Sequence, residues 1–148
     1  MTELSQIMNS GWLSPRRVQN GIAAVFLSLG GWAILFPEFV VSLTMTPPYR
    51  EGAGVPFVLG CFGLQACICG ALLLLTTLDR RGFILFALIC APFLVFDVWF
   101  VVVQPVLTPL GGALDGIGNI IMISLCLKAA SDFATSPTFS GTGTSHEA

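Results

Sequence analysis

Residues 82–103 read GFILFALICAPFLVFDVWFVVV, and this stretch decides the fold. Asp97 is its single charged residue, and the stretch has the length of about 20 residues that an α-helix needs to cross the hydrocarbon of a bilayer. A helix satisfies all of its own backbone polar groups there, and the sequence has none of the alternating patterns of a β-barrel. The pattern therefore predicts a transmembrane helix.

Three more apolar stretches predict an all-α, four-helix transmembrane bundle. The expected spans are 15–36, 53–78, 82–103 and 109–128, within a membrane domain of residues 15–130. Hydrophobic residues make up 55% of the chain and charged residues only 9%, whereas soluble domains have about 25% charged residues. We therefore expect an integral, multi-pass membrane protein that has the lipid bilayer as its partner. The net charge of -2 favours no nucleic-acid partner.

Caps and prolines mark the ends of these spans. Ser14 is a candidate N-cap before Pro15. Thr108 precedes Pro109 in the same way, and Pro92 predicts a kink in the third span. A secretory signal peptide is the alternative for the first span, but no small-x-small cleavage site follows it, so we expect an uncleaved anchor.

Basic residues predict the orientation. One side of a four-span arrangement holds Arg16, Arg17, Arg80, Arg81 and Lys128. Only Arg50 falls on the other side, and cytoplasmic loops are the ones enriched in Lys and Arg. We therefore expect both termini inside, with residues 1–14 as a cytoplasmic segment and residues 131–148 as a disordered cytoplasmic tail. The outer loop at 37–52 is expected to lie at the lipid headgroups.

Small residues predict where the helices pack, because close backbone approach drives helix association in lipid. On the first span an arc of small residues includes Asn20, Ala24, Ser28 and Gly31. The second span has a similar arc, and the fourth has a GxxxG step, so the expected packing glycines are Gly31, Gly60, Gly63, Gly70, Gly112 and Gly116.

The cysteines and the histidine favour no metal or haem site. The five cysteines all lie inside spans, at positions 61, 67, 69, 90 and 126, where we expect them to behave as small apolar residues. Residues two apart on a helix point in different directions, so Cys67 and Cys69 do not have a metal-binding spacing. The one histidine, His146, lies in the tail. We expect no metal and no cofactor.

Asp97 and Asp115 are the acids well inside the predicted hydrocarbon, where an ionised group costs at least about 2.5–3.5 kcal/mol. Each lies six residues in from the outer end of its span, which is about 9 Å deep at about 1.5 Å per residue. Asp115 shares a helix face with Asn119, and Asp97 is in line with Gln104. The two helices are therefore expected to meet along a polar seam.

Two interpretations of this seam remain open. In the first it is a site for a cation, a proton or a polar small molecule, with at least one acid protonated because two neighbouring charges in low dielectric are costly. The residues of this candidate site are Asp97, Asp115, Asn119, Arg50 and Gln104. In the second interpretation the seam is structural: Arg50 reaches down to one carboxylate, and the other acid bonds to Asn119 or to a carbonyl that Pro92 leaves free.

Several short motifs follow one another along the chain. They are LGGW at 29–32, LFP at 35–37, REG at 50–52 and then a glycine-rich second span. In this order they resemble the DoxX-like four-helix membrane proteins, over roughly residues 15–130. The strings DRRGF at 79–83 and PFLVFDVW at 92–99 also look like uncharacterised small membrane proteins of fungi. These resemblances imply a membrane subunit or accessory protein and assign no catalytic residue.

Three classes of function fit these observations. The first is a non-catalytic membrane component, either a homo-oligomer or a subunit of a larger membrane complex. The second is a small proton-coupled transporter that uses Asp97 and Asp115. The third is a membrane enzyme that acts on a lipid-soluble substrate with the two acids as acid and base. The enzyme is the least favoured, because the chain has no nucleophile motif or metal cluster to support it.

Overall fold

The computed structural model describes residues 14–52 and 54–135, and the predicted cytoplasmic segment 1–14 and tail 131–148 lie mostly outside these residues. In the described part the regular secondary structure is helical, without a β-strand. The elements are α2 (Pro15–Leu35), α3 (Pro37–Thr44), α4 (Pro47–Arg50), α5 (Gly54–Leu75), α6 (Arg80–Val98), the π-helix η1 (Trp99–Val103) and α7 (Pro109–Thr135).

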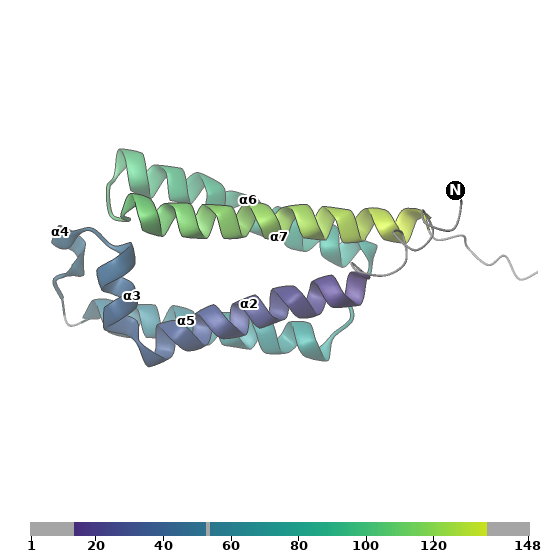
Figure 1. Ribbon diagram of the computed structural model, residues 1–148, viewed down its shortest axis with the longest axis horizontal. Coiled ribbons are helices and arrows are strands. Elements are labelled where there is room, and N and C mark those ends of the chain that lie inside the picture. Colours follow the sequence, from purple (N-terminus) through teal and green to yellow (C-terminus); the bar gives the residue numbers. More distant parts are fainter. Residues whose placement is uncertain (1–13, 53, 136–148) are drawn as a thin grey trace, which may run out of the picture.

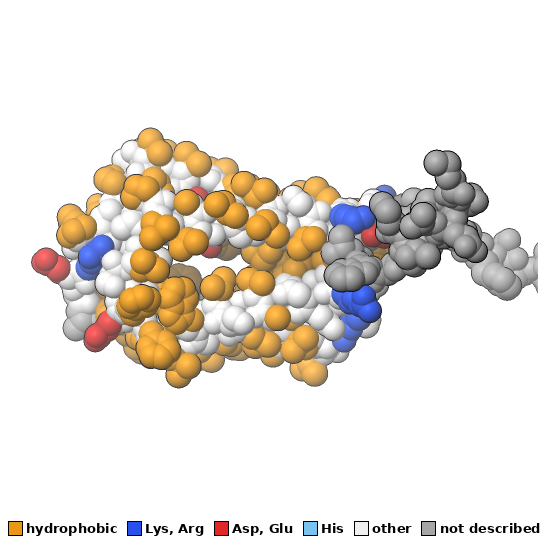
Figure 2. Space-filling view, in the orientation of Figure 1, with side chains coloured by type: hydrophobic (Ala, Val, Ile, Leu, Met, Phe, Trp, Pro, Cys, Tyr) orange, Lys and Arg blue, Asp and Glu red, His pale blue; other side chains and the backbone are white. Residues whose placement is uncertain are grey.

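Within the described residues, four helical segments are long and apolar enough to cross a membrane. They are Pro15–Leu35, Gly54–Leu75, Arg80–Val103 and Pro109–Phe133. Large apolar side chains on their surfaces are exposed, for example Phe57 at 73% and Leu88 at 63%, and Figure 2 shows such side chains over much of the visible face. A surface of this kind is stable against lipid tails and not against water. The prediction of an all-helical chain with four apolar helices long enough to span a membrane is confirmed.

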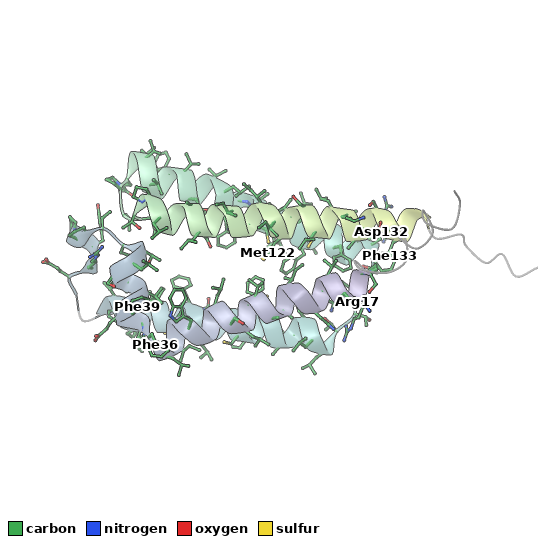
Figure 3. All side chains as sticks on the ribbon, viewed as in Figure 1. Arg17, Phe36, Phe39, Met122, Asp132 and Phe133 are labelled. Carbon is green, nitrogen blue, oxygen red and sulfur yellow. The ribbon has the colours of Figure 1, made fainter. Side chains whose placement is uncertain are left out.

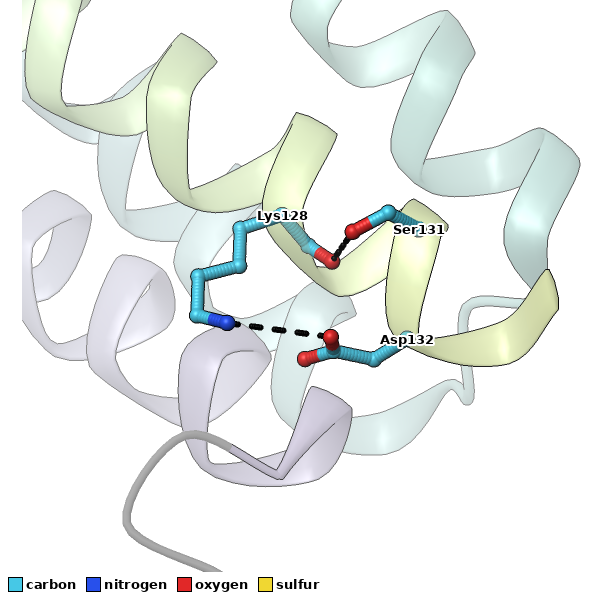
Figure 4. A network of polar contacts seen from close by, with 3 residues as sticks. All are labelled: Lys128, Ser131 and Asp132. Atoms are coloured by element: carbon cyan, nitrogen blue, oxygen red, sulfur yellow. Dashed lines mark hydrogen bonds and ion pairs between the residues drawn. The ribbon is translucent and has the colours of Figure 1, made fainter. Parts of the chain in front are cut away.

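The structure extends the last helix beyond the expected end at residue 128. Lys128 forms an ion pair with Asp132 one turn later, at 3.7 Å, and Ser131 Oγ donates a hydrogen bond to the Lys128 carbonyl (Figure 4). Opposite charges four residues apart stabilise a helix in water. The charged residue Lys128 therefore marks where the helix is expected to leave the hydrocarbon, and the helix itself continues beyond that point.

The long helices are arranged as two antiparallel pairs. The helix α2 packs along α5, and α6 packs along α7 (Figure 1). The pairs meet around one buried cluster, which consists of Val18, Ile22, Ala23, Leu73, Phe83, Ala87, Cys126, Ala129 and Ala130. The cluster lies at the end of the bundle where α2 begins with Arg16 and Arg17, and we call this end of the bundle the basic end. Figure 3 shows Arg17 of α2 and Asp132 and Phe133 of α7 together at this end.

Two side chains of α2 close the basic end of the first pair. The Gln19 amide is 2% exposed, donates to the carbonyls of Leu73 and Thr76, and accepts a hydrogen bond from the Leu78 N–H. The Arg16 guanidinium donates to the carbonyls of Thr76 and Leu74. A helix leaves its last carbonyls without intrahelical partners, and these two residues supply the missing donors for α5.

At the opposite end, which we call the α3 end, the two pairs diverge. The helix α3 bridges them, and Figure 2 shows the molecular surface hollowed between the pairs. The bridge is fastened to the connection between η1 and α7, where Thr108 Oγ1 accepts from the Gly111 N–H and donates to the Leu43 carbonyl at 2.9 Å. The Thr46 N–H also donates to the Val106 carbonyl. The segment expected as a headgroup loop thus contains the short helices α3 and α4, and α3 is tied to the second pair.

Glycines of α5 set its distance from α2. A Cβ on Gly63 would lie 2.7 Å from the Gly30 carbonyl oxygen, and one on Gly70 would lie 2.9 Å from the Ala23 carbonyl oxygen. A Cβ on Gly31 or Gly60 would meet open space. The contacting face of α2 runs through Ala23 and Gly30, one residue before the small residues expected there. One residue rotates a helix face by about 100°, so the expected arc is turned away from α5.

Candidate polar site between α6 and α7

Asp97 lies in the seam between the two helices of the second pair. Its side chain is 8% exposed, and its Oδ2 atom is buried without a hydrogen-bond partner. A Cβ on Gly116 of α7 would stand 3.4 Å from this oxygen. The absence of a side chain at Gly116 therefore gives the carboxylate its place against α7.

Asp115 and Asn119 approach Asp97 from α7. Asn119 Nδ2 donates to Asp115 Oδ2 and to the Asp115 carbonyl, at 3.1 Å each. Asp115 is the ionisable side chain nearest to Asp97 across the seam. The structure brings these three side chains together.

The surroundings of Asp115 differ from those of its neighbours on α7. Asn119 is one turn away on the same face and is 5% exposed, whereas Asp115 is exposed. Met122 lies on this face as well, packs against the buried cluster at the basic end, and points from α7 toward α2 in Figure 3. On the other side of Asp115, Gly111 contacts Thr44 at the end of α3. Asp115 therefore lies between these two contacts, where the helix pairs diverge.

Asp97 also lines an open groove of about 390 Å³ along the outside of the seam. The lining residues are Leu94, Asp97, Val98, Val101, Val102, Pro109, Gly112, Ala113, Gly116 and Ile120. Asp97 is the only ionisable residue among them, and Asp115 is not part of the lining. The acid pair thus connects an apolar groove on one side of the seam with the space between the helix pairs on the other.

Arg50 and Gln104 are not part of this cluster. Arg50 Nε donates to the Met45 carbonyl, and no ion pair links Arg50 to either acid in the described part of the chain. Gln104 is exposed just after η1, and its N–H donates to the Trp99 carbonyl at 2.9 Å. A π-turn has more residues per turn than an α-turn. The side chain of Gln104 is therefore rotated out of line with Asp97, an effect that α-helical periodicity does not include.

The groove is the part of the site that sequence reasoning missed. Its wall includes Val101, and a Cβ on Gly112 would collide with the Val101 side chain. The available signal was the GxxxG step at Gly112 and Gly116 together with the intramembrane acid Asp97. This signal does not predict a groove, because the groove wall also includes Val101 of the π-helix η1. Among the described residues, no group of three His, Cys, Asp or Glu side chains is placed to hold a metal ion.

Comparisons with protein-family models, with curated proteins and with solved structures found no match to this chain.

Proposed function

We propose that the protein is a small membrane carrier coupled to protons, with both termini on the cytoplasmic side and the Asp97–Asp115 pair as its proton-binding site. The observation that carries the proposal is the buried Asp97 carboxyl group, which has one oxygen without a partner and has Asp115 as its ionisable neighbour. Ionisable residues inside membrane helices are costly, and they mark proton relays and substrate sites.

The pair has the chemistry that proton exchange requires. Two neighbouring carboxyl groups in a low dielectric are costly to ionise together, so one of them would keep a proton. Asn119 orients the Asp115 side chain through the hydrogen bond from its Nδ2 atom to Asp115 Oδ2. A ligand that donates a hydrogen bond or carries positive charge would replace this proton, and the competition would couple the movement of the ligand to the movement of the proton.

The shape of the bundle supports one stage of a transport cycle. The helix pairs are packed together at the basic end and diverge at the α3 end. Alternating access requires a closed end and an open end that exchange. Closing the α3 end would bring α2 toward Asp115. The surroundings of the acid pair would therefore change when the open and closed ends exchange.

The orientation in this proposal rests on charge. Figure 2 shows Lys and Arg side chains gathered at the basic end. Such residues are retained on the cytoplasmic side of a membrane. The open end of the bundle then faces outward.

The proposal is tested by following protons in the purified chain. In infrared difference spectra taken across a pH titration, we expect a protonated-carboxyl band that disappears in both Asp97→Asn and Asp115→Asn. In proteoliposomes with a pH-sensitive dye inside, a panel of amines, amino acids and sugars should include a compound that moves protons. Glu51→Gln is the control, because Glu51 is exposed near α4. Proton movement that is unchanged in the double Asp→Asn variant would end the proposal.

A second function, a subunit of a membrane complex, is favoured by the outer face of α2. Asn20, Ala24 and Ser28 are exposed, and a Cβ on Gly31 would meet open space. Smooth faces of small residues are the ones that membrane helices pack against. Native mass spectrometry would test this function: Ala24→Phe should release a bound copy or partner, whereas Val25→Phe, next to it on α2, should not.

A further inference from the structure

We infer that the groove along the outside of the α6–α7 seam binds the ammonium group of a lipid-soluble amine at Asp97. The inference deepens the proposed carrier function, since the amine would compete with the proton for the same acid pair. Asp97 marks one wall of the groove, and Gly116 marks the opposite wall.

The groove fits an apolar molecule. Its volume of about 390 Å³ is within the range of about 300–1,000 Å³ that is typical of small-molecule sites. Apart from Asp97, its lining consists of aliphatic side chains, proline and glycine. The body of a bound molecule would therefore gain contacts with apolar groups only.

Asp97 fits a positively charged hydrogen-bond donor. Asp97 lines the groove, and its Oδ2 atom is buried beside it without a hydrogen-bond partner. A carboxylate oxygen accepts hydrogen bonds, and a bond from a charged N–H is stronger than one from a neutral donor. A bare metal ion fits poorly, because it needs several oxygen ligands and the groove offers one carboxylate.

The exposure of the groove indicates the direction of approach. Val98 is 63% exposed and Val102 is 72% exposed, and both belong to the apolar surface of a candidate membrane span. A molecule dissolved in the bilayer would meet this face directly. The ligand class is therefore an amine that is soluble in lipid, arriving sideways from the membrane.

Equilibrium dialysis of the full chain in lipid nanodiscs tests the inference. The probe is radiolabelled dodecyldimethylamine, and dodecanol is the neutral comparison of equal chain length. Above the partition into empty nanodiscs, we expect saturable binding of the amine with a stoichiometry near one per chain and no such excess for dodecanol. Asp97→Asn should weaken amine binding by about tenfold or more, because it removes the charge and keeps the shape.

A second variant keeps the test valid if Asp97→Asn does not fold. Val102→Phe fills the groove from an exposed position and leaves the acid pair intact, so it should also abolish the excess binding. Glu51→Gln should bind as the unchanged chain does. Equal binding of dodecanol, or full amine binding in Val102→Phe, would overturn the inference. Amine binding without proton movement would refute the carrier alone, and proton movement without amine binding would refute the amine site alone.

Discussion

At the scale of single residues, two buried polar side chains of the bundle have opposite surroundings. Every polar atom of the Gln19 amide has a partner at the end of α5, whereas Asp97 keeps one oxygen without a partner. A buried polar group with all its bonds stabilises structure, and one without a bond costs free energy. Gln19 therefore has a structural role, whereas Asp97 has an oxygen that a ligand could still bind.

Gln19→Leu should lower the free energy of unfolding by about 1–3 kcal/mol, because it leaves the α5 carbonyls with fewer donors. Gln65→Leu is the matched control, since Gln65 is exposed on α5. Reversible unfolding in mixed micelles measures both variants. A stability of Gln19→Leu equal to that of Gln65→Leu would contradict the role assigned to Gln19.

At the scale of helices, the sequence predicts that each helix exists better than it predicts which face of the helix packs against its neighbour. The four spans follow from hydrocarbon length and from caps such as Thr108, whose Oγ1 accepts from the Gly111 N–H at 3.0 Å. The choice of face does not follow, because a small residue suits a helix contact and also a surface toward lipid. Gly30 and Gly31 are adjacent and chemically identical, and only the packed structure distinguishes them.

Gly30→Ala should separate α2 from α5, because its Cβ would lie 2.5 Å from the Gly63 carbonyl oxygen. We expect a loss of about 1–3 kcal/mol in the free energy of unfolding, as for other overpacked contacts. Gly31→Ala should leave stability unchanged or slightly raised. The reverse order of the two variants in a thermal melt would show that the contacting face of α2 is the one expected from sequence alone.

The candidate site was only partly accessible to sequence reasoning. Asp115 and Asn119 are one turn apart on one predicted helix, and Asp97 has the same expected depth on the preceding helix, so their meeting could be anticipated from the sequence. Arg50 has a side chain long enough to reach the acids, which is why the sequence suggests it for the site. In the structure its Nε donates to the nearby Met45 carbonyl instead. The likeness to DoxX-like proteins stays a prediction.

At the scale of the whole molecule, the separation of charge between the two ends predicts the topology. In a cysteine-free background, Thr77→Cys lies in the exposed connection before α6, at the basic end, and Pro48→Cys lies on exposed α4. A membrane-impermeant maleimide added to intact cells should label Pro48→Cys and reach Thr77→Cys only after permeabilisation. Labelling of both from outside would exclude the orientation with both termini in the cytoplasm.

The pairing of the helices also bears on how the protein is made. The partners α2 and α5 are successive spans, and so are α6 and α7. A nascent chain that has left the ribosome as far as Leu78 already contains Gln19, Arg16 and the carbonyls that they bind. The first hairpin can therefore be completed at the translocon before the second is synthesised, and assembly reduces to docking two finished halves.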